Sequence, residues 1–261
     1  MGILNVTPDS FSDGGRFVDV AGAVAHGLEL AREGAAIVDV GGESTRPGSA
    51  PVAQDEELRR VVPVIEGLAA AGCAAAISID TSKLAVARAA LDAGATFVND
   101  VTAFRGSPGM AELVAARGAD CCLVHMRGEP RTMQEDPRYE DVVGEVCAFL
   151  HERVQAALAA GVARERILVD PGIGFGKTVA HNLELLDRLD ELAGLGQQIL
   201  VGTSRKSFLG RLDGGRTRDR LAGTIATNVI ALLRGASVFR VHDVAPVRDA
   251  LDVAAATVSG R

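Results

Sequence analysis

The chain has 261 residues but no tryptophan, one tyrosine and only 3% aromatic residues. Hydrophobic residues still make up 48% of it, so aliphatic side chains must fill the interior. A chain of this length can bury a large core. Small and branched aliphatic residues suit closely packed helices and layered barrel strands, and they suit an all-β sandwich poorly. The scarcity of aromatic residues therefore favours a mixed α/β protein.

Cysteine is also scarce, and no disulfide or zinc pattern is visible. The four cysteines are Cys73, Cys121, Cys122 and Cys147, and none forms a C-x-x-C pair. Cys121 and Cys122 are neighbours, so on a strand their side chains would point in opposite directions. We expect all four to be small apolar residues in a reducing compartment, and we place the protein in the cytoplasm.

Long apolar runs and clusters of positive charge are absent as well. No run reaches the ~18 residues of a membrane helix, and the N-terminus lacks the pattern of a secretory signal. The chain carries 27 basic and 34 acidic residues, a net charge of −7, without the clustered Lys and Arg that nucleic acid requires. We therefore expect neither a membrane nor a nucleic-acid partner.

Short apolar runs alternate with longer stretches of helical periodicity that end at glycine. Near-continuous apolar character is typical of parallel strands, which are buried on both faces. Eight such units in about 260 residues predict a single-domain (β/α)₈ TIM barrel over residues 1–261. The predicted strands are Gly2–Asn5, Ala36–Gly41, Ala75–Asp80, Phe97–Asp100, Cys121–Met126, Ile167–Asp170, Ile199–Gly202 and Val238–His242. The predicted helices are Val20–Arg32, Ser82–Asp92, Tyr139–Ala160, Leu183–Leu192 and Arg218–Leu233.

An open doubly wound sheet is the alternative fold. It would usually carry a glycine-rich fingerprint after the first strand, but a polar loop, Val6–Phe17, stands there. The chain begins directly at the first strand. Barrels of this kind often have an N-terminal segment that closes the base, and we expect that segment to be missing.

Every predicted strand ends in polar or ionisable residues. In (β/α)₈ barrels, chemistry takes place at these carboxyl ends and on the loops that follow them. Polar groups at all eight ends therefore predict an active site at one end of the barrel. The residues at or near the ends are Asn5, Asp39, Asp80, Asn99, Asp100, His125, Asp170, Ser204, Arg240, His242 and Asp243.

The strand-end residues are of two chemical kinds. Asp80, Asn99 and Asp170 are acceptors, which suit the N–H edge of a heterocycle. The alternative for each aspartate is to cap a helix or pair with Lys or Arg, but three together favour a ligand site.

The second kind is cationic or rich in donors, as needed to hold phosphate or carboxylate. Loops after strands seven and eight often form phosphate sites in barrels. Arg205 is the exception, because it suits an ion pair that holds its loop. The donors are Arg46, Lys206, Arg240 and His242, with the hydroxyls of Ser44, Thr45, Ser204 and Ser207.

The glycine-rich segment Gly172–Lys177 is similar to a Walker A loop, but Pro171 stands where that motif needs glycine. We interpret the glycines as a tight turn that lets Phe175 lean over a planar ligand. No histidine pair has zinc-ligand spacing, so we expect no protein-caged zinc.

Five segments of the chain are distinctive: residues 1–15 (MGILNVTPDSFSDGG), 41–48 (GGESTRPG), 170–177 (DPGIGFGK), 204–207 (SRKS) and 240–242 (RVH). They resemble the hallmark segments of dihydropteroate synthases, and the likeness spans the whole chain. The resemblance implies a transferase of folate biosynthesis that condenses 6-hydroxymethyl-7,8-dihydropterin pyrophosphate with p-aminobenzoate and yields 7,8-dihydropteroate and pyrophosphate.

The resemblance also implies residue roles. The pterin ring would be bound by Asp80, Asn99, Met126, Asp170 and Lys206. The pyrophosphate would be held by Asn5, Thr45, Arg46, Arg240 and His242. The p-aminobenzoate pocket would consist of Phe11, Pro47, Phe175, Lys206 and Ser207. The cofactor would be Mg²⁺, with Asn5 and Asp13 as ligands. The catalytic group would be Asn5, Asp80, Asp170, Lys206 and Arg240.

The family resemblance implies a homodimer formed through C-terminal helices, and Leu221–Leu233 and Val244–Val258 are rich in Ala, Val and Leu. Sulfonamides should compete in the aminobenzoate pocket. The loops Val6–Phe17 and Glu43–Val52 are expected to close over metal and pyrophosphate.

Two other functions compete with this interpretation. A pterin-dependent methyltransferase would not need a pyrophosphate cluster, so Arg46, Arg240 and His242 argue against it. A non-catalytic pterin-binding paralogue should lose loop residues first, yet Asn5 and Asp13 are present.

Overall fold

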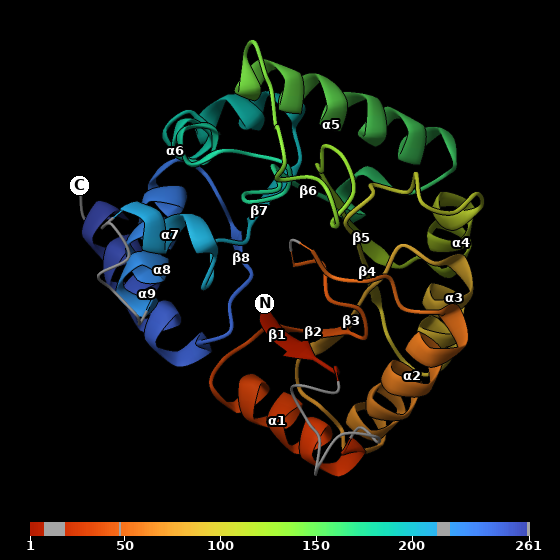
Figure 1. Ribbon diagram of the computed structural model, residues 1–261. Coiled ribbons are helices and arrows are strands. Elements are labelled where there is room, and N and C mark those ends of the chain that lie inside the picture. Colours follow the sequence, from red (N-terminus) through yellow and green to blue (C-terminus); the bar gives the residue numbers. More distant parts are fainter. Residues whose placement is uncertain (8–18, 47, 213–219, 260–261) are drawn as a thin grey trace.

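The computed structural model describes residues 1–7, 19–46, 48–212 and 220–259. Parallel strands pair in the order β1 to β8 and curl into a barrel, around which the helices form an outer ring (Figure 1). Each of the eight predicted strands is present. Most bounds coincide with the prediction, the others differ by one or two residues, and only the end of β8 differs by more. The strands are β1 Gly2–Asn5, β2 Ile37–Gly41, β3 Ala76–Asp80, β4 Phe97–Asp100, β5 Asp120–Val124, β6 Ile167–Asp170, β7 Gln198–Val201 and β8 Val238–Phe239.

The barrel closes between the first strand and the chain that follows the last one. Gly2 bridges Val241 in parallel. The Ile3 amide donates to the Val241 carbonyl at 2.9 Å, and the Val241 amide donates to the Met1 carbonyl at 2.9 Å. β8 is shorter than predicted: the Arg240 amide still donates to the Val201 carbonyl of β7 at 2.9 Å, and Val241 then pairs with β1 in the closure. The predicted (β/α)₈ fold is confirmed.

Helix ends follow local capping chemistry. The Asp19 side chain accepts from the Gly22 amide, and α1 spans the predicted residues. The predicted helix 183–192 was placed too late, because Thr178 caps a helix in a reciprocal box with His181. The helices are α1 Val20–Arg32, α2 Gln54–Ala70, α3 Leu84–Asp92, α4 Met110–Arg117, α5 Val142–Ala159, α6 Val179–Asp187, α7 Ser207–Leu212, α8 Leu221–Leu233 and α9 Val244–Ser259, with the 3₁₀ helices η1 Arg164–Arg166 and η2 Leu189–Leu195.

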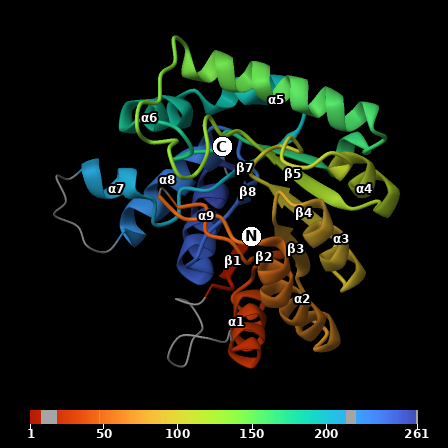
Figure 2. The ribbon, with the colours of Figure 1, turned by 45° about the vertical axis from the view of Figure 1, so that its right-hand side comes forward.

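Helices α8 and α9 pack against each other on one side of the ring, where Figures 1 and 2 both show them together. No helix within the described segments is long and apolar enough to cross a bilayer.

Strand residues alternate between two hydrophobic clusters. Outward-facing residues such as Val38 and Val98 pack against the helices, and inward-facing residues such as Ile37 and Phe97 fill the barrel. Cys121 and Cys122 belong to opposite clusters, as predicted, and all four cysteines are free. The strand periodicity therefore sorts the side chains into a core and a barrel interior.

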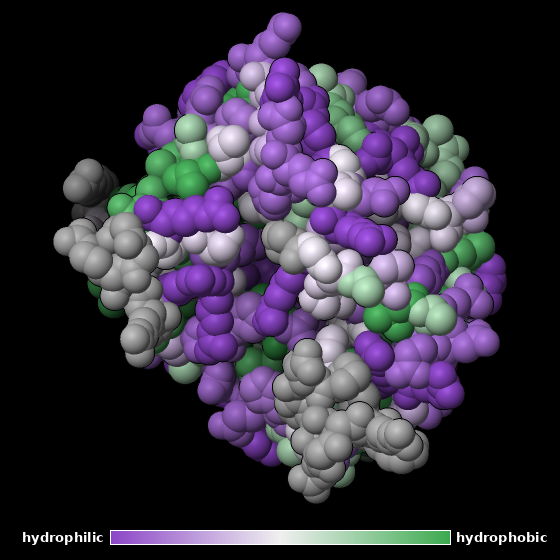
Figure 3. Space-filling view, viewed as in Figure 1, coloured by the Kyte–Doolittle hydropathy of each residue, from purple (hydrophilic) through white to green (hydrophobic). Residues whose placement is uncertain are grey.

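The inward-facing positions change from apolar to polar toward the carboxyl end of the strands. Side chains on one face of a strand recur every second residue. On several strands an apolar inward-facing residue is therefore followed, two residues later, by a polar one. Figure 3 shows the resulting hollow, with hydrophilic residues around it. Ile37 is followed two residues later by Asp39, Phe97 by Asn99, Leu168 by Asp170 and Val238 by Arg240.

Candidate active site

A pocket at the carboxyl end of the barrel brings together residues from distant parts of the chain. Its free volume is only about 20 Å³. Lys206 reaches from the β7 side to β6, and Arg240 reaches from β8 to β2 and β3, so both long side chains lie across it. The lining residues are Thr45, Asp80, Asn99, Val101, Val124, Asp170, Phe175, Gly202, Lys206 and Arg240.

Arg240 is bonded to two carboxylates. Its Nε donates to Asp39 Oδ2 at 2.6 Å, and its Nη2 donates to Asp80 Oδ2 at 2.6 Å. Burial raises the pKa of Asp80 to about 7, against the opposing charge of Arg240. Asp80 and Arg240 were predicted for different parts of a substrate, and the structure joins them directly.

Asp39 is the polar residue of this cluster to which the sequence assigned no role. Its carboxylate accepts from Ser78 Oγ at 2.5 Å and from Asn99 Nδ2 at 3.0 Å, and its side chain is fully buried. The only signal in the sequence was an aspartate inside an apolar strand. The sequence does not indicate its partners, because the barrel fold brings Ser78, Asn99 and Arg240 to it from other strands.

Asn99 presents a defined side of its amide to the pocket. The residue is 4% exposed, its Nδ2 donates to Asp39, and its buried Oδ1 has no partner within the described residues. A carboxylate only accepts hydrogen bonds, so the nitrogen must face Asp39 and the oxygen must face the other way. The pocket therefore offers an acceptor at this point.

Lys206 lies at the junction of the acidic groups and the aromatic wall. Its Nζ donates to the Ile173 carbonyl and lies 4.4 Å from the centre of the Phe175 ring. Burial lowers the pKa of Lys206 to about 8, and the charge of Asp170 acts in the opposite direction. Burial also raises the pKa of Asp170, whose Oδ1 accepts from the Gly172 amide at 2.6 Å.

The glycine-rich loop after β6 is held from inside by a buried lysine. Lys177 Nζ donates to the carbonyls of Gly172 at 2.9 Å and Phe175 at 3.1 Å, and lies 2.8 Å from His125 Nδ1. Burial lowers the pKa of His125 to about 2, so its ring is neutral and Nδ1 can accept a hydrogen bond from Lys177. His125, directly after β5, thus contacts the lysine that holds the loop.

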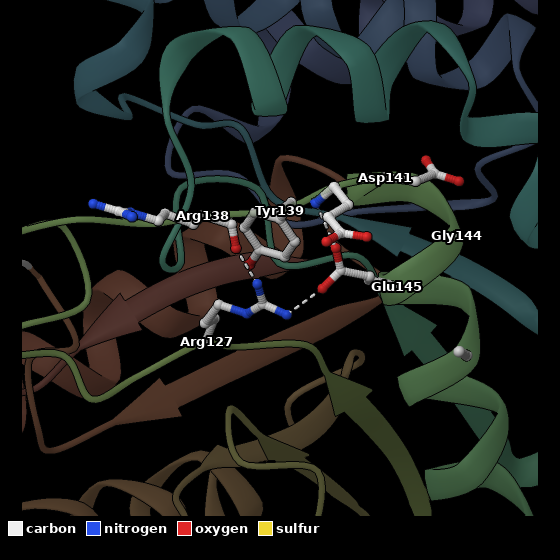
Figure 4. Close-up of a pocket in the computed structure, with 8 residues that line it drawn as sticks. Arg127, Arg138, Tyr139, Asp141, Gly144 and Glu145 are labelled. Carbon is white, nitrogen blue, oxygen red and sulfur yellow. Dashed lines mark hydrogen bonds and ion pairs between the residues drawn. The ribbon is translucent and has the colours of Figure 1, made fainter.

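The same loop is held from outside by side chains near the start of α5 (Figure 4). Tyr139 Oη donates to the Gly176 carbonyl at 2.9 Å. The Arg127 guanidinium stacks 3.9 Å from the Tyr139 ring centre and pairs with Glu145. A surface hollow of about 740 Å³ lies here. Both arginines that line it are already paired, Arg127 with Glu145 and Arg138 with Asp136, so we interpret the hollow as the outer edge of the side chains that hold the loop.

Other predicted residues lie around the rim. Asn5 is half-buried at the end of β1, next to Gly41, and Arg46 is exposed. His242 Nδ1 is 3.0 Å from Ser204 Oγ, and burial lowers the pKa of His242 to about 4. Ser207 is exposed at the first residue of α7.

The remaining predicted residues do not line the pocket or lie outside the described residues. Met126 is buried in the inward-facing cluster, two residues after the end of β5, and does not line the pocket. Phe11, Asp13 and Pro47 lie outside the described residues. Arg205 pairs with Asp243 at 2.5 Å, in agreement with its interpretation as a residue that holds the loop.

The described polar residues at the strand ends offer few ligands for a divalent cation. Within the described residues, no group of three His, Cys, Asp or Glu side chains could hold a metal. Mg²⁺ does not need such a cage, because it keeps several waters and binds through one or two protein oxygens together with phosphate. Asn5, whose side chain makes no hydrogen bond to another described residue, fits one of these oxygens.

Fold and pocket together define a class: a (β/α)₈ barrel whose strand-end pocket combines buried carboxylates and an amide with two cationic side chains. Residues 1–242 match the family described as "Pterin binding enzyme". The chain is 47% identical over 261 residues to the dihydropteroate synthase of Escherichia coli K12, covering 100% of this chain and 92% of that protein. It therefore belongs to the dihydropteroate synthase family.

Solved structures give the same answer. Dihydropteroate synthase of Xanthomonas albilineans with 4-aminobenzoic acid superposes with a TM-score of 0.91 and 51% identity, covering 98% of this chain and 92% of that one. The Yersinia pestis dihydropteroate synthase in a sulfonamide complex superposes with a TM-score of 0.92 and 45% identity, covering 99% of this chain and 94% of that one.

Proposed function

We propose that this chain condenses 6-hydroxymethyl-7,8-dihydropterin pyrophosphate with p-aminobenzoate to form 7,8-dihydropteroate and pyrophosphate. The observation that carries the proposal is one pocket that combines buried acceptors with two cationic side chains. Family membership supports the same reaction.

The acceptors would hold the pterin ring. Asp80 on β3, Asp170 on β6 and the Asn99 oxygen on β4, which has no partner among the described residues, line the pocket, and ring N–H groups are their natural donors. Met126 would pack nearby as an apolar floor. Removing such an acceptor should weaken pterin binding selectively.

The cations would hold the pyrophosphate after an exchange of partners. Arg240 is bonded to Asp80 in the structure, so ring N–H groups that bind Asp80 would replace Nη2 and free it for phosphate oxygens. Thr45, Arg46 and His242 would complete the anion site. Ring binding and pyrophosphate binding are thereby linked.

The chemistry would be a substitution at the exocyclic methylene. The C–O bond breaks, its electron pair leaves with pyrophosphate, and the cation left on the methylene is conjugated to the ring. Ionised Asp80 and Asp170 would stabilise this cation through space. The neutral aromatic amine then forms the C–N bond and loses a proton to water, so no strong general base is needed.

Mg²⁺ would be held by Asn5 and Asp13 together with phosphate oxygens. When bound, it would neutralise the charge of the leaving pyrophosphate. Lys206 and Arg240 contribute positive charge to the same site from the protein side.

The second substrate would lie above the pterin. Phe175, Lys206 and Ser207 would form its pocket with Phe11 and Pro47. Sulfonamides resemble p-aminobenzoate and should compete there, as the Yersinia pestis complex suggests for its own enzyme.

The chain would act in the cytoplasm as a homodimer. Its free cysteines support a reducing compartment. Exposed apolar residues on the last two helices, Ile230, Leu233 and Val253, support self-association through α8 and α9. The acidic net charge of −7 supports the absence of a nucleic-acid partner.

The test is pyrophosphate release from the pterin ester, with and without p-aminobenzoate and Mg²⁺. We expect release coupled to dihydropteroate formation, and near-complete loss in Lys206→Ala because one donor serves both pockets. No release under any condition would refute the synthase assignment, and near-normal turnover of Lys206→Ala would refute its dual role.

A further inference from the structure

Asp39 is central to the polar cluster but does not line the pocket. It is fully buried, and its two oxygens accept from Ser78, Asn99 and Arg240. Asn99 and Arg240 do line the pocket. A side chain in this place cannot touch the substrate, but it contacts two groups that would.

The contact with Asn99 has a chemical direction. An amide can present either oxygen or nitrogen, and the two ends differ little in size. An ionised carboxylate behind the amide bonds only to the nitrogen, which leaves the oxygen for the pocket. That oxygen is buried and has no partner within the described residues, so it is an acceptor held ready for a donor.

The contact with Arg240 is independent of Asp80. Nε is bonded to Asp39 and Nη2 to Asp80, so different edges of the guanidinium are used. If a ring displaces Arg240 from Asp80, the bond to Asp39 still holds the guanidinium at the pocket edge.

We propose that Asp39 is a positioning residue that directs the Asn99 oxygen into the pocket and tethers Arg240 beside it. The inference rests on the proposed function, because it concerns the side of the amide offered to the pterin ring. It assigns to a buried residue part of the selectivity for a heterocycle that presents N–H donors.

The test measures the Kd of 6-hydroxymethylpterin with the full chain by calorimetry. Asp39→Asn removes the carboxylate charge that holds Asn99 Nδ2 and Arg240 Nε, which both bond to Oδ2, so the Asn99 amide is no longer forced to present its oxygen to the pocket. We expect Kd to rise about 10- to 100-fold, the size of a lost charge-assisted hydrogen bond with a mismatched donor. The KM for p-aminobenzoate should stay near its wild-type value, because Phe175 and Ser207 do not contact Asp39.

A reciprocal exchange separates positioning from mere loss of packing. Asn99→Asp alone sets two carboxylates against each other and should bind pterin poorly. Asn99→Asp combined with Asp39→Asn restores one donor and one acceptor between the two side chains, keeps the total charge and again leaves an oxygen toward the pocket, although Arg240 Nε loses the oxygen that it shares with Asn99. The double variant should therefore bind pterin more tightly than Asn99→Asp alone, a comparison that holds even if Asp39→Asn by itself does not fold.

Ser78→Ala is the matched control, since it removes a donor to Asp39 without touching Asn99 or Arg240. It should bind pterin nearly as wild type does. Wild-type affinity in Asp39→Asn, no recovery in the double variant, or an equal loss in Ser78→Ala would each overturn the positioning role. Failure of the wild-type chain to bind pterin would instead refute the proposed function on which the role depends.

Discussion

Asp80 and Lys206 are ionisable residues of the pocket whose pKa values are moved toward neutrality from opposite sides. Burial raises the pKa of Asp80 from 3.8 to about 7 and lowers that of Lys206 from 10.5 to about 8. Asp80 is therefore ionised above about pH 7, and Lys206 is protonated below about pH 8. The charges that the proposed mechanism needs coexist best between these values.

The pKa values of Asp80 and Lys206 predict a narrow pH range of activity. The kcat/KM for the pterin substrate should rise with pH through about 7, as Asp80 ionises, and fall through about 8, as Lys206 loses its proton. Steady-state kinetics in a constant-ionic-strength buffer series would measure it. Lys206→Arg, which stays charged, should lose the alkaline limb. A flat profile from about pH 6 to 9 would contradict the prediction.

Asn5 allows a second test at the scale of single residues. If its side-chain oxygen is a Mg²⁺ ligand, Asn5→Ala should raise the Mg²⁺ concentration needed for half-maximal rate by about 10-fold or more, the effect of one lost ligand contact. Titration of the rate with MgCl₂ measures this. Unchanged metal dependence would show that Asn5 is not a ligand, and Ser207→Ala, in the other pocket, serves as the control.

At the scale of elements, the loop after β6 is held by side chains on both of its faces. Lys177 holds two of its carbonyls from inside, and Tyr139 holds the Gly176 carbonyl from outside. The loop carries Phe175 and the Ile173 carbonyl that receives Lys206. A rigid loop would thus fix one wall of the aminobenzoate pocket.

Lys177→Met should therefore disturb one substrate more than the other. We expect the KM for p-aminobenzoate to rise about 5- to 10-fold, as for the loss of one or two hydrogen bonds. The KM for the pterin substrate should change less, because Asp80 and Asn99 lie on other strands and only Asp170 and Lys206 of the pterin group contact the loop. Equal changes in both KM values would contradict a local effect on the loop.

Gly172 shows how closely this loop approaches the barrel. Its φ is +68°, and an added Cβ would lie 1.8 Å from the His125 carbonyl oxygen. Gly172→Ala should destabilise the protein by about 3 kcal/mol or more, from left-handed strain and overpacking together. Gly196→Ala, with φ +71° and nothing within 4 Å, isolates the strain and should lose about 1 kcal/mol. Urea unfolding compares them, and equal losses would contradict the close approach.

At the scale of the whole molecule, α8 and α9 leave apolar side chains uncovered. Leu233 is 55% exposed and Val253 is 68% exposed. Leu233→Glu combined with Val253→Glu should shift the chain from dimer to monomer in sedimentation velocity. Ala116→Glu on α4, on the opposite side of the ring from α8 and α9 in Figure 1, should leave the dimer intact. A wild-type chain that sediments as a monomer would refute the proposed dimer.

The sequence by itself determined the number of strands, their order and the polar residue at each end. These features are local, since apolar runs, glycine stops and the alternation of side chains are set by neighbouring residues. The motifs around Asp170 and Arg240 also indicated which residues belong to the site. Helix starts were less certain where a cap such as Thr178 lies outside the apolar pattern.

Only the tertiary structure decided how the strand-end residues pair. Asp39 and Arg240 are 201 residues apart and meet only because the barrel closes. Their contact, the direction of the Asn99 amide and the buried Lys177 beside His125 depend on strand register and on exclusion of water. No local pattern encodes such pairings, because a carboxylate at a strand end can face a ligand, a cap or an arginine until the fold sets its neighbours.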